Sequence, residues 1–211
     1  MRFSVLTLNL HTWQESDQLE KLDLIARYIV EENISCVSFQ ECGQRREAEV
    51  VDDPTAHSLT EERPLRGDNA ALLVRSRLET YGLKYGLVWG FSHTSFGEYE
   101  EGSAILTQLP VLGSCSRFVS AESDPGSIHA RNVVMTRLAA APNSVIDVYS
   151  VHLSWPDAGL QGQLESLVGF VDETPEILEQ MKPPPPKRRG PPRKRRATAE
   201  PVVSTRLVCL A

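Results

Sequence analysis

Two polar residues follow apolar runs near the start of the chain and could share one metal ion. Asn9 ends an apolar run that begins at Phe3, and Glu41 follows a second run over residues 34–39. Between the runs, apolar residues recur at helical spacing over about residues 19–29. A strand–helix–strand unit of this length closes with parallel strands, so both polar residues should lie at one edge of the sheet. An amide and a carboxylate there suit Mg²⁺, with Mn²⁺ as the alternative ion.

Taken alone, this pair has a plain structural explanation, in which Asn9 makes a turn and Glu41 starts a solvated loop. Three further residues must therefore decide between a metal site and this structural explanation. Glu101 ends an acidic run and precedes Gly102, Arg131 precedes a predicted strand, and His152 follows another. Each of them also has a plain explanation, as part of a polar loop, a solvated arginine or a structural histidine.

Taken in order, five motifs resemble those of the endonuclease/exonuclease/phosphatase superfamily. The motifs are Leu6-Thr7-Leu8-Asn9, Phe39-Gln40-Glu41, Glu101-Gly102-Ser103-Ala104-Ile105-Leu106 with Leu109-Pro110-Val111, His129-Ala130-Arg131, and Val151-His152-Leu153-Ser154-Trp155. The resemblance covers Met1 to about Asp172. It implies an α/β fold of the family's type, a two-sheet, four-layer α/β sandwich, and a metal-dependent phosphoric ester hydrolase.

The resemblance also implies roles for single residues of this sequence. Glu41 and Asn9 are expected to bind the metal, and Arg131 and His152 are expected to contact the substrate phosphate. Catalytic roles are expected for His152, Glu101 and Asn9, with Glu101 orienting the histidine.

Two motifs that complete the family's active site do not occur after His152 in the printed sequence. These are G-D-x-N, which provides the general base, and S-D-H, which provides a second histidine. The pair Gly67-Asp68 precedes Glu101 and is typical of a loop that opens a helix, here to about Tyr81. After a predicted helix over about residues 163–171, no family-like strand is expected. We therefore expect a fold incomplete at the C-terminus, with uncovered sheet edges, poor solubility and little or no turnover.

Charge and proline content divide the chain near Met181. Residues 1–181 hold 13 Lys and Arg against 27 Asp and Glu, a net charge of −14. Residues 182–211 hold 9 against 1, a net charge of +8, and 7 of the 14 prolines. Because such a segment cannot bury a core, we expect a truncated domain over 1–181 and a disordered Pro/Arg-rich tail over 182–211. Three origins of the tail compete, in this order: a truncated or frameshifted gene, a true basic arm, and a fragment completed by another chain.

The charge of residues 1–181 favours a small phosphorylated substrate over nucleic acid. DNA binding depends mainly on neutralising backbone phosphates, for which a net charge of −14 is poorly suited. Residues 9–13 and 152–157 also resemble a small bacterial group that includes sugar-phosphate phosphatases. An endonuclease or exonuclease is the alternative within the family. A non-catalytic nucleic-acid-binding protein, resting on basic runs within residues 187–196, is the alternative outside it.

Neither a membrane span nor a secretory signal is predicted from the sequence. No apolar run approaches the ~20 residues that a bilayer crossing requires, and the first residues lead into a strand-like stretch. The cysteines form no C-x-x-C pair and receive neither a disulfide nor a metal; they are Cys36, Cys42, Cys115 and Cys209. These features predict a cytoplasmic protein without a membrane partner, and they indicate no particular oligomeric state.

Overall fold

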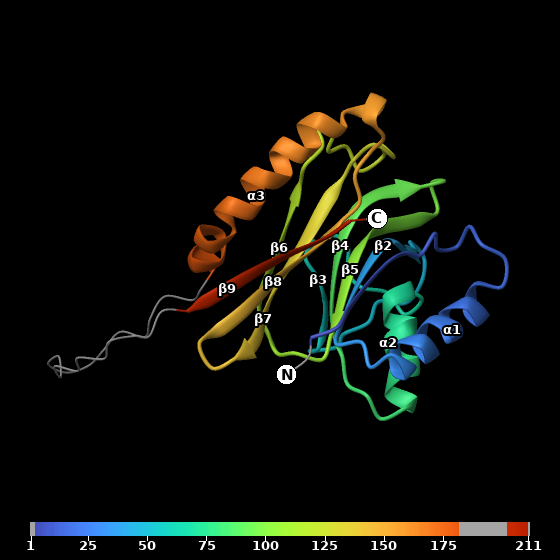
Figure 1. Cartoon of the computed structure of the whole chain (residues 1–211). Coiled ribbons are helices and arrows are strands. Elements are labelled where there is room, and N and C mark those ends of the chain that lie inside the picture. Colours follow the sequence, from blue (N-terminus) through green and yellow to red (C-terminus); the bar gives the residue numbers. More distant parts are fainter. Residues whose placement is uncertain (1–2, 182–201, 211) are drawn as a thin grey trace, which may run out of the picture.

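Two β-sheets pack face to face in the computed structural model, which describes residues 3–181 and 202–210 (Figure 1). One sheet has five strands in the order β1-β2-β5-β4-β3, and the other has four in the order β6-β7-β8-β9. The strands are β1 (Val5–Asn9), β2 (Cys36–Arg45), β3 (Ala56–Ser58), β4 (Gly86–Ser95), β5 (Tyr99–Thr107), β6 (Val111–Phe118), β7 (Asn132–Ala141), β8 (Ser144–Val151) and β9 (Val203–Leu210).

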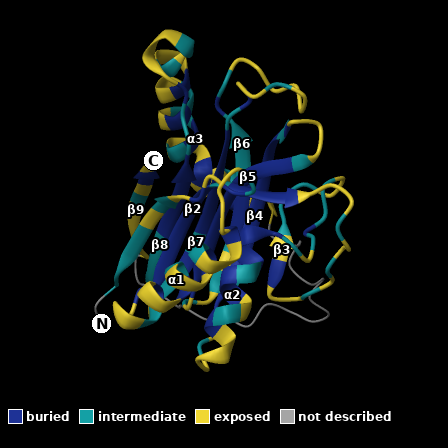
Figure 2. Ribbon diagram, turned by 90° about the vertical axis from the view of Figure 1, so that its right-hand side faces the viewer, coloured by how far each residue is buried: buried dark blue, intermediate teal, exposed yellow. Residues whose placement is uncertain are grey.

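Helices cover the outer faces of the sheets (Figure 1). They are α1 (Gln18–Glu31), α2 (Ala70–Thr80) and α3 (Leu160–Met181), with the short 3-10 helix η1 (Pro156–Ala158) before α3. Helices α1 and α2 pack against each other beside the five-stranded sheet, whereas α3 contacts β6 of the other sheet. The predicted two-sheet, four-layer α/β sandwich is therefore confirmed, and the buried residues lie mainly along the strands between the helical layers (Figure 2). No helix in the described ranges is long and apolar enough to cross a membrane.

The first strand–helix–strand unit has the predicted topology. Strand β1 pairs with β2 in parallel, with Asn9 opposite Gln40. Helix α1 follows the predicted spacing, because its buried face includes Leu22, Ala26 and Ile29. Asn9, at the end of β1, therefore lies beside Gln40 and Glu41 of β2.

The sequence pattern predicted that strand β2 ends at Glu41, but the strand does not end there. It continues to Arg45, and its pairing with β5 is interrupted between Phe39 and Cys42. Glu41 lies in this bulge with a φ of 47°, which is uncommon for a residue other than glycine. The pattern misled because the following polar residues are buried too: Gln44 is fully buried and donates to Glu100 at 2.8 Å. The bulge, and not a strand end, turns the Glu41 side chain.

The C-terminal residues correct the expectation of a disordered tail over 182–211. Residues 182–201 lie outside the described residues, but Val203–Leu210 form β9, which pairs with β8 in parallel from Ser144↔Val203 to Val151↔Leu210. A strand therefore does follow α3. Its Val and Thr residues favour β-structure, and the prediction failed because the composition was averaged over a segment dominated by Pro and Arg.

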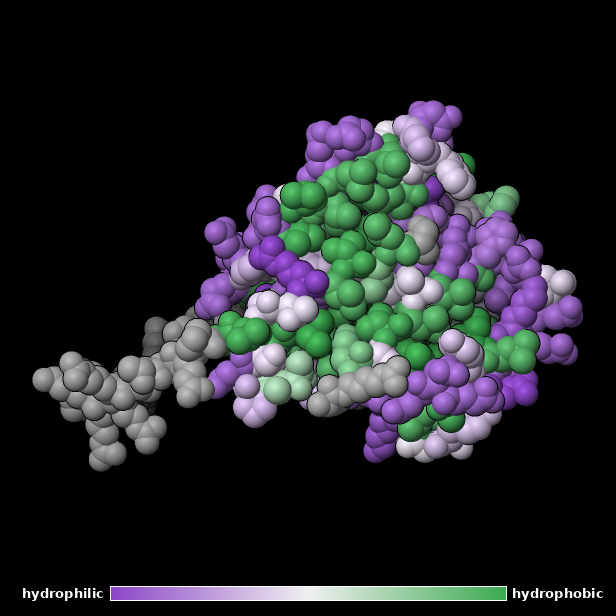
Figure 3. All heavy atoms as spheres, viewed as in Figure 1, coloured by the Kyte–Doolittle hydropathy of each residue, from purple (hydrophilic) through white to green (hydrophobic). Residues whose placement is uncertain are grey.

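Strand β9 is the edge of its sheet and leaves apolar side chains exposed. Within the described residues, no strand pairs with its second edge. Val203 is 62% exposed and Leu210 is 53% exposed. Hydrophobic atoms gather on the face of the molecule that carries α3 and β9 (Figure 3). An unpaired edge with apolar side chains promotes association, which supports the expectation of poor solubility. Poor solubility itself stays a prediction.

Candidate functional site

Three predicted site residues meet at one edge of the sandwich. Asn9 ends β1, Glu41 lies in the bulge of β2, and His152 follows β8 of the other sheet. Asn9 Nδ2 donates a hydrogen bond to Glu41 Oε1 at 2.9 Å. The same carboxylate oxygen lies 3.6 Å from His152 Nε2. An amide, a carboxylate and an imidazole therefore form one cluster that bridges the two sheets.

Arg131 lies on the other side of His152. Its Nη1 is 3.4 Å from His152 Nδ1, and its Nε donates to Ser154 Oγ at 3.2 Å. Burial, followed by the charge of Arg131, lowers the pKa of His152, while the charge of Glu41 raises it. A neutral imidazole satisfies both neighbours, since Nδ1 accepts from Arg131 and a proton on Nε2 faces Glu41. The tautomer of His152 is thus fixed from both sides.

Glu101 contacts a different histidine from the one that the family resemblance implies. Its buried carboxylate accepts a hydrogen bond from Ser95 Oγ at 3.0 Å and lies 3.3 Å from His93 Nε2. The acidic neighbour of His152 is Glu41 instead. Burial, and then the charge of Glu41, raises the pKa of Glu101. The expectation that Glu101 orients His152 is therefore corrected: the histidine that lies beside Glu101 is His93.

Residues that follow Asn9 shape the site and were not predicted. His11 donates its backbone N–H to Asn9 Oδ1 at 3.0 Å, and its ring Nε2 lies 3.9 Å from Glu41 Oε2. Buried Thr12 donates to the Glu41 carbonyl at 2.5 Å and accepts the Gly43 N–H at 2.6 Å. A Cβ at Gly43 would lie 3.0 Å from Thr12 Oγ1 and 3.1 Å from Trp13 Cδ1, so a larger residue there would require these side chains to shift. The polar residues directly after Asn9 were the available sequence signal for this support.

The orientation of Asn9 bears on its predicted role as a metal ligand. Because Asn9 Oδ1 accepts the His11 N–H, the amide presents its own N–H groups to Glu41. In this arrangement Asn9 positions the carboxylate. Direct binding of a metal by Asn9 stays a prediction.

The acidic group of the site fits a cation that needs few protein ligands. Among the residues that the structure describes, no group of three or more His, Cys, Asp or Glu could hold a metal ion. Glu41 would therefore act as a single carboxylate ligand, and its side chain is 17% exposed. Mg²⁺ commonly binds one or two carboxylates and keeps water or substrate phosphate in its other positions. The donor set fits Mg²⁺, and Mn²⁺ favours the same oxygen ligands.

Protonation of His93 is expected to destabilise the fold in acid. Burial, more than the nearby charge of Arg131, lowers the pKa of His93 to about 4, whereas an unfolded histidine titrates near ~6.5. Between these values the unfolded chain binds more protons, so the free energy of unfolding falls as the pH is lowered, by up to ~1.4 kcal/mol per pH unit. Urea unfolding from neutral pH down to the pKa of His93 should show wild type losing stability relative to His93→Gln.

The comparison with His93→Gln isolates this one histidine. Burial raises the pKa of Glu101, which opposes the loss of stability both in wild type and in His93→Gln. A difference between the two proteins that does not change with pH would contradict the assignment of a buried, neutral His93.

Comparisons with known proteins place the fold. No family model and no curated protein matches the chain. Among solved structures, an endonuclease/exonuclease/phosphatase family protein from Leptotrichia buccalis C-1013-b has a TM-score of 0.70 and 26% identity, covering 80% of this chain and 61% of that one. An endonuclease/exonuclease/phosphatase from Bacteroides vulgatus has a TM-score of 0.52 and 14% identity, covering 83% and 60%.

A third structure, an endonuclease/exonuclease/phosphatase from Beutenbergia cavernae DSM 12333, has a TM-score of 0.50 and 19% identity, covering 85% of this chain and 44% of that one. The chain thus spans 61% of the length of the Leptotrichia protein. The two matches of lower identity support the fold alone, and the Leptotrichia match extends the likeness to sequence. The predicted resemblance is confirmed: this chain shares the fold of the endonuclease/exonuclease/phosphatase family and carries motifs similar to that family's.

Proposed function

We propose that this chain carries part of the active site of a Mg²⁺-dependent phosphoesterase that acts on a small phosphorylated metabolite. The contact between Glu41 Oε1 and His152 Nε2, at 3.6 Å, supports this proposal most strongly. It joins a carboxylate suited to a cation with the Arg131–His152 pair, which is suited to a phosphate. Three charged or polar groups of the kinds that phosphoryl transfer requires therefore face one point between the two sheets.

Different residues of the chain would contact the cation and the phosphate of the substrate. When bound, Mg²⁺ supplies charge neutralisation of the phosphoryl oxygens. Arg131, held by Ser154 at 3.2 Å, presents its guanidinium to a phosphate oxygen. His152 offers the proton on Nε2 to a second oxygen, and Asn9 keeps Glu41 in place. The family's general base belongs to the G-D-x-N motif, so we assign the activation of water to none of these residues.

Charge around the site supports a small substrate. Glu41 belongs to the cluster, Glu101 lies near it, and Glu15 lies beyond His11, where it pairs with Lys21; Arg131 brings a positive charge to His152. Such surroundings repel a polyanion but accept a single phosphate that shares the cation. The basic runs that supported a nucleic-acid-binding protein lie outside the described residues.

Replacing Arg131 by methionine is expected to weaken binding of a sugar phosphate by about 10- to 100-fold, since a charged hydrogen bond contributes ~1.5–3 kcal/mol. Calorimetry with glucose 6-phosphate in Mg²⁺ measures this change, and release of phosphate from a panel of sugar phosphates and from plasmid DNA is measured alongside. We expect little turnover, because the printed sequence carries neither G-D-x-N nor S-D-H after His152.

A matched control is Arg117→Met, which removes an arginine that pairs with Glu173 at 2.7 Å, away from the cluster. This variant should bind like wild type. Equal binding by the Arg131 and Arg117 variants would overturn the phosphate role of Arg131. Faster cleavage of plasmid DNA than of every sugar phosphate would overturn the small-substrate part of the proposal.

A further inference from the structure

A cavity lies at the end of the five-stranded sheet opposite Glu41. Its volume is about 860 Å³, which is within the usual size range of small-molecule sites. Thr107 lines the cavity and pairs with Cys36 at the start of β2, whereas Glu101, six residues earlier in β5, pairs with Gly43, two residues after Glu41. At ~3.3 Å per residue, the two sites are roughly 20 Å apart.

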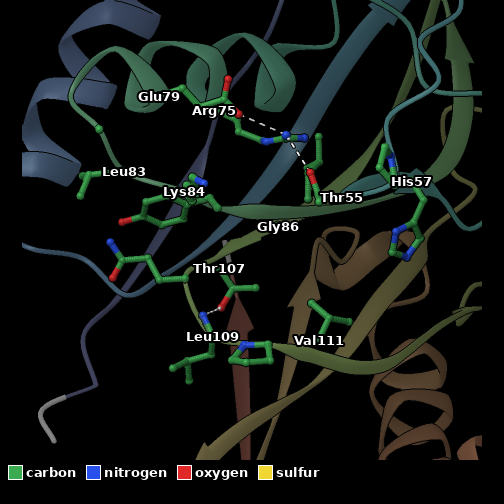
Figure 4. Close-up of a pocket in the computed structure, with 16 residues that line it drawn as sticks. Thr55, His57, Arg75, Glu79, Leu83, Lys84, Gly86, Thr107, Leu109 and Val111 are labelled. Carbon is green, nitrogen blue, oxygen red and sulfur yellow. Dashed lines mark hydrogen bonds and ion pairs between the residues drawn. The ribbon is translucent and has the colours of Figure 1, made fainter.

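The walls of the cavity differ in character. One wall is formed by Arg75 and Glu79 of α2, and the opposite wall is formed by Leu109 and Val111. Gly86 lies between the two walls (Figure 4). The apolar part of the lining comprises Leu83, Tyr85, Leu87, Leu109, Pro110 and Val111. A ligand with an apolar body and one polar group would match these walls.

The polar wall contains a buried arginine with unused hydrogen-bonding capacity. The Arg75 side chain is 8% exposed, and its Nη2 donates to Asp53 Oδ2, Thr55 Oγ1 and Glu79 Oε1 at 2.8, 2.9 and 3.1 Å. Its Nε and Nη1 are buried and make no hydrogen bond. A buried donor without a partner is unfavourable, so an acceptor on a ligand that reached Nε or Nη1 would be stabilised there.

Two positive residues of the lining are available to an anion. They are Arg75 and Lys84, and both Asp53 and Glu79 already pair with Arg75, at 2.8 and 3.1 Å. The side chain of Glu79 is 50% exposed, so its contact with Arg75 is weak and can be replaced. A planar carboxylate matches the guanidinium in shape as well as in charge.

We propose that this cavity binds a small organic carboxylate, with the carboxylate on Arg75 and the apolar body against Leu109 and Val111. Nothing in the candidate active site takes part, so the inference stands apart from the proposed phosphoesterase function. The probe is 3-phenylpropionate, whose neutral analogue 3-phenylpropionamide has nearly the same shape. By NMR titration, the carboxylate should bind wild type with a dissociation constant on the order of 1 mM, and the amide at least about 5-fold more weakly, since a charged hydrogen bond is the stronger one.

Two variants on different walls test the placement. At Gly86 an added Cβ would meet only ordinary contacts, 3.8 Å from the Thr55 carbonyl oxygen and 3.8 Å from Val111 Cγ2, so Gly86→Leu should fill the cavity and abolish binding. Glu79→Gln removes the competing carboxylate and should tighten binding about 2- to 5-fold. Glu41→Gln, at the other end of the sheet, should leave binding unchanged.

Equal binding of acid and amide would overturn the proposal, as would undiminished binding by a folded Gly86→Leu. If Gly86→Leu does not fold, two variants at the rim of the cavity, Glu79→Gln and Lys84→Glu, test the proposal instead, because both change exposed charges. Tighter binding by Glu79→Gln together with weaker binding by Lys84→Glu supports the site. Any other result from this pair contradicts it.

Discussion

Replacing Cys209 by aspartate is expected to lower the free energy of unfolding by about 3 kcal/mol or more, because an unpaired carboxylate would be buried. Cys209 is 5% exposed in β9 and packs in a core cluster with Cys36, Val88 and Ile105 from the other sheet. Burial raises the pKa of its thiol, as expected for an apolar site. Urea unfolding followed by circular dichroism measures the loss.

The neighbouring residue provides a matched control for Cys209→Asp. Val208 is 38% exposed and points to the opposite face of the strand, because successive side chains of a strand alternate. Val208→Asp should therefore cost only about 1 kcal/mol. If both variants are as stable as wild type, β9 is not docked against β8, and the original expectation of an unstructured tail would be restored.

Gly102→Ala is expected to destabilise the protein by about 3 kcal/mol or more, which is at the upper end of overpacking effects. A Cβ at position 102 would lie 2.0 Å from the carbonyl oxygen of Gly90 and 3.1 Å from Phe91 Cα, so the backbone of β4 or β5 must move. The shift would also displace Glu101, which precedes the glycine. Thermal unfolding of the variant gives the loss of stability directly.

Gly162→Ala is the control for Gly102→Ala. Gly162 lies in α3, and a Cβ there has nothing within 4 Å. Since alanine favours helix over glycine by ~0.5–1 kcal/mol, this variant should be as stable as wild type or more so. A Gly102→Ala protein as stable as the Gly162 variant would contradict the close approach of β4 and β5.

The sequence predicted the parts of the site that depend on strand ends and motif order. Apolar runs located the ends of β1 and β8, and parallel pairing of β1 with β2 followed from the helix between them. Asn9, Glu41 and His152 accordingly meet as expected. This part of the site was accessible because buried strands are apolar and their ends are polar.

The parts that were missed depend on register and on buried polar residues. His93 pairs with Glu101 across β4 and β5, and this pairing follows an irregularity between Phe91 and His93 that no sequence period reveals. The continuation of β2 was hidden because buried Gln44 is satisfied by Glu100, a partner distant in sequence. Hydrogen bonds between residues far apart in the chain replaced the apolar pattern on which the prediction relied.

We propose that Glu41, supported by Asn9 and beside His152, holds a divalent cation. Calorimetric titration with Mn²⁺ tests it most directly, on wild type, on Glu41→Gln, and on Asp157→Asn as a control that removes an acid from η1. We expect one site in wild type and in the control, with affinity at least ~10-fold lower in Glu41→Gln, because a carboxylate ligand is lost. Equal Mn²⁺ affinity in wild type and Glu41→Gln would contradict it.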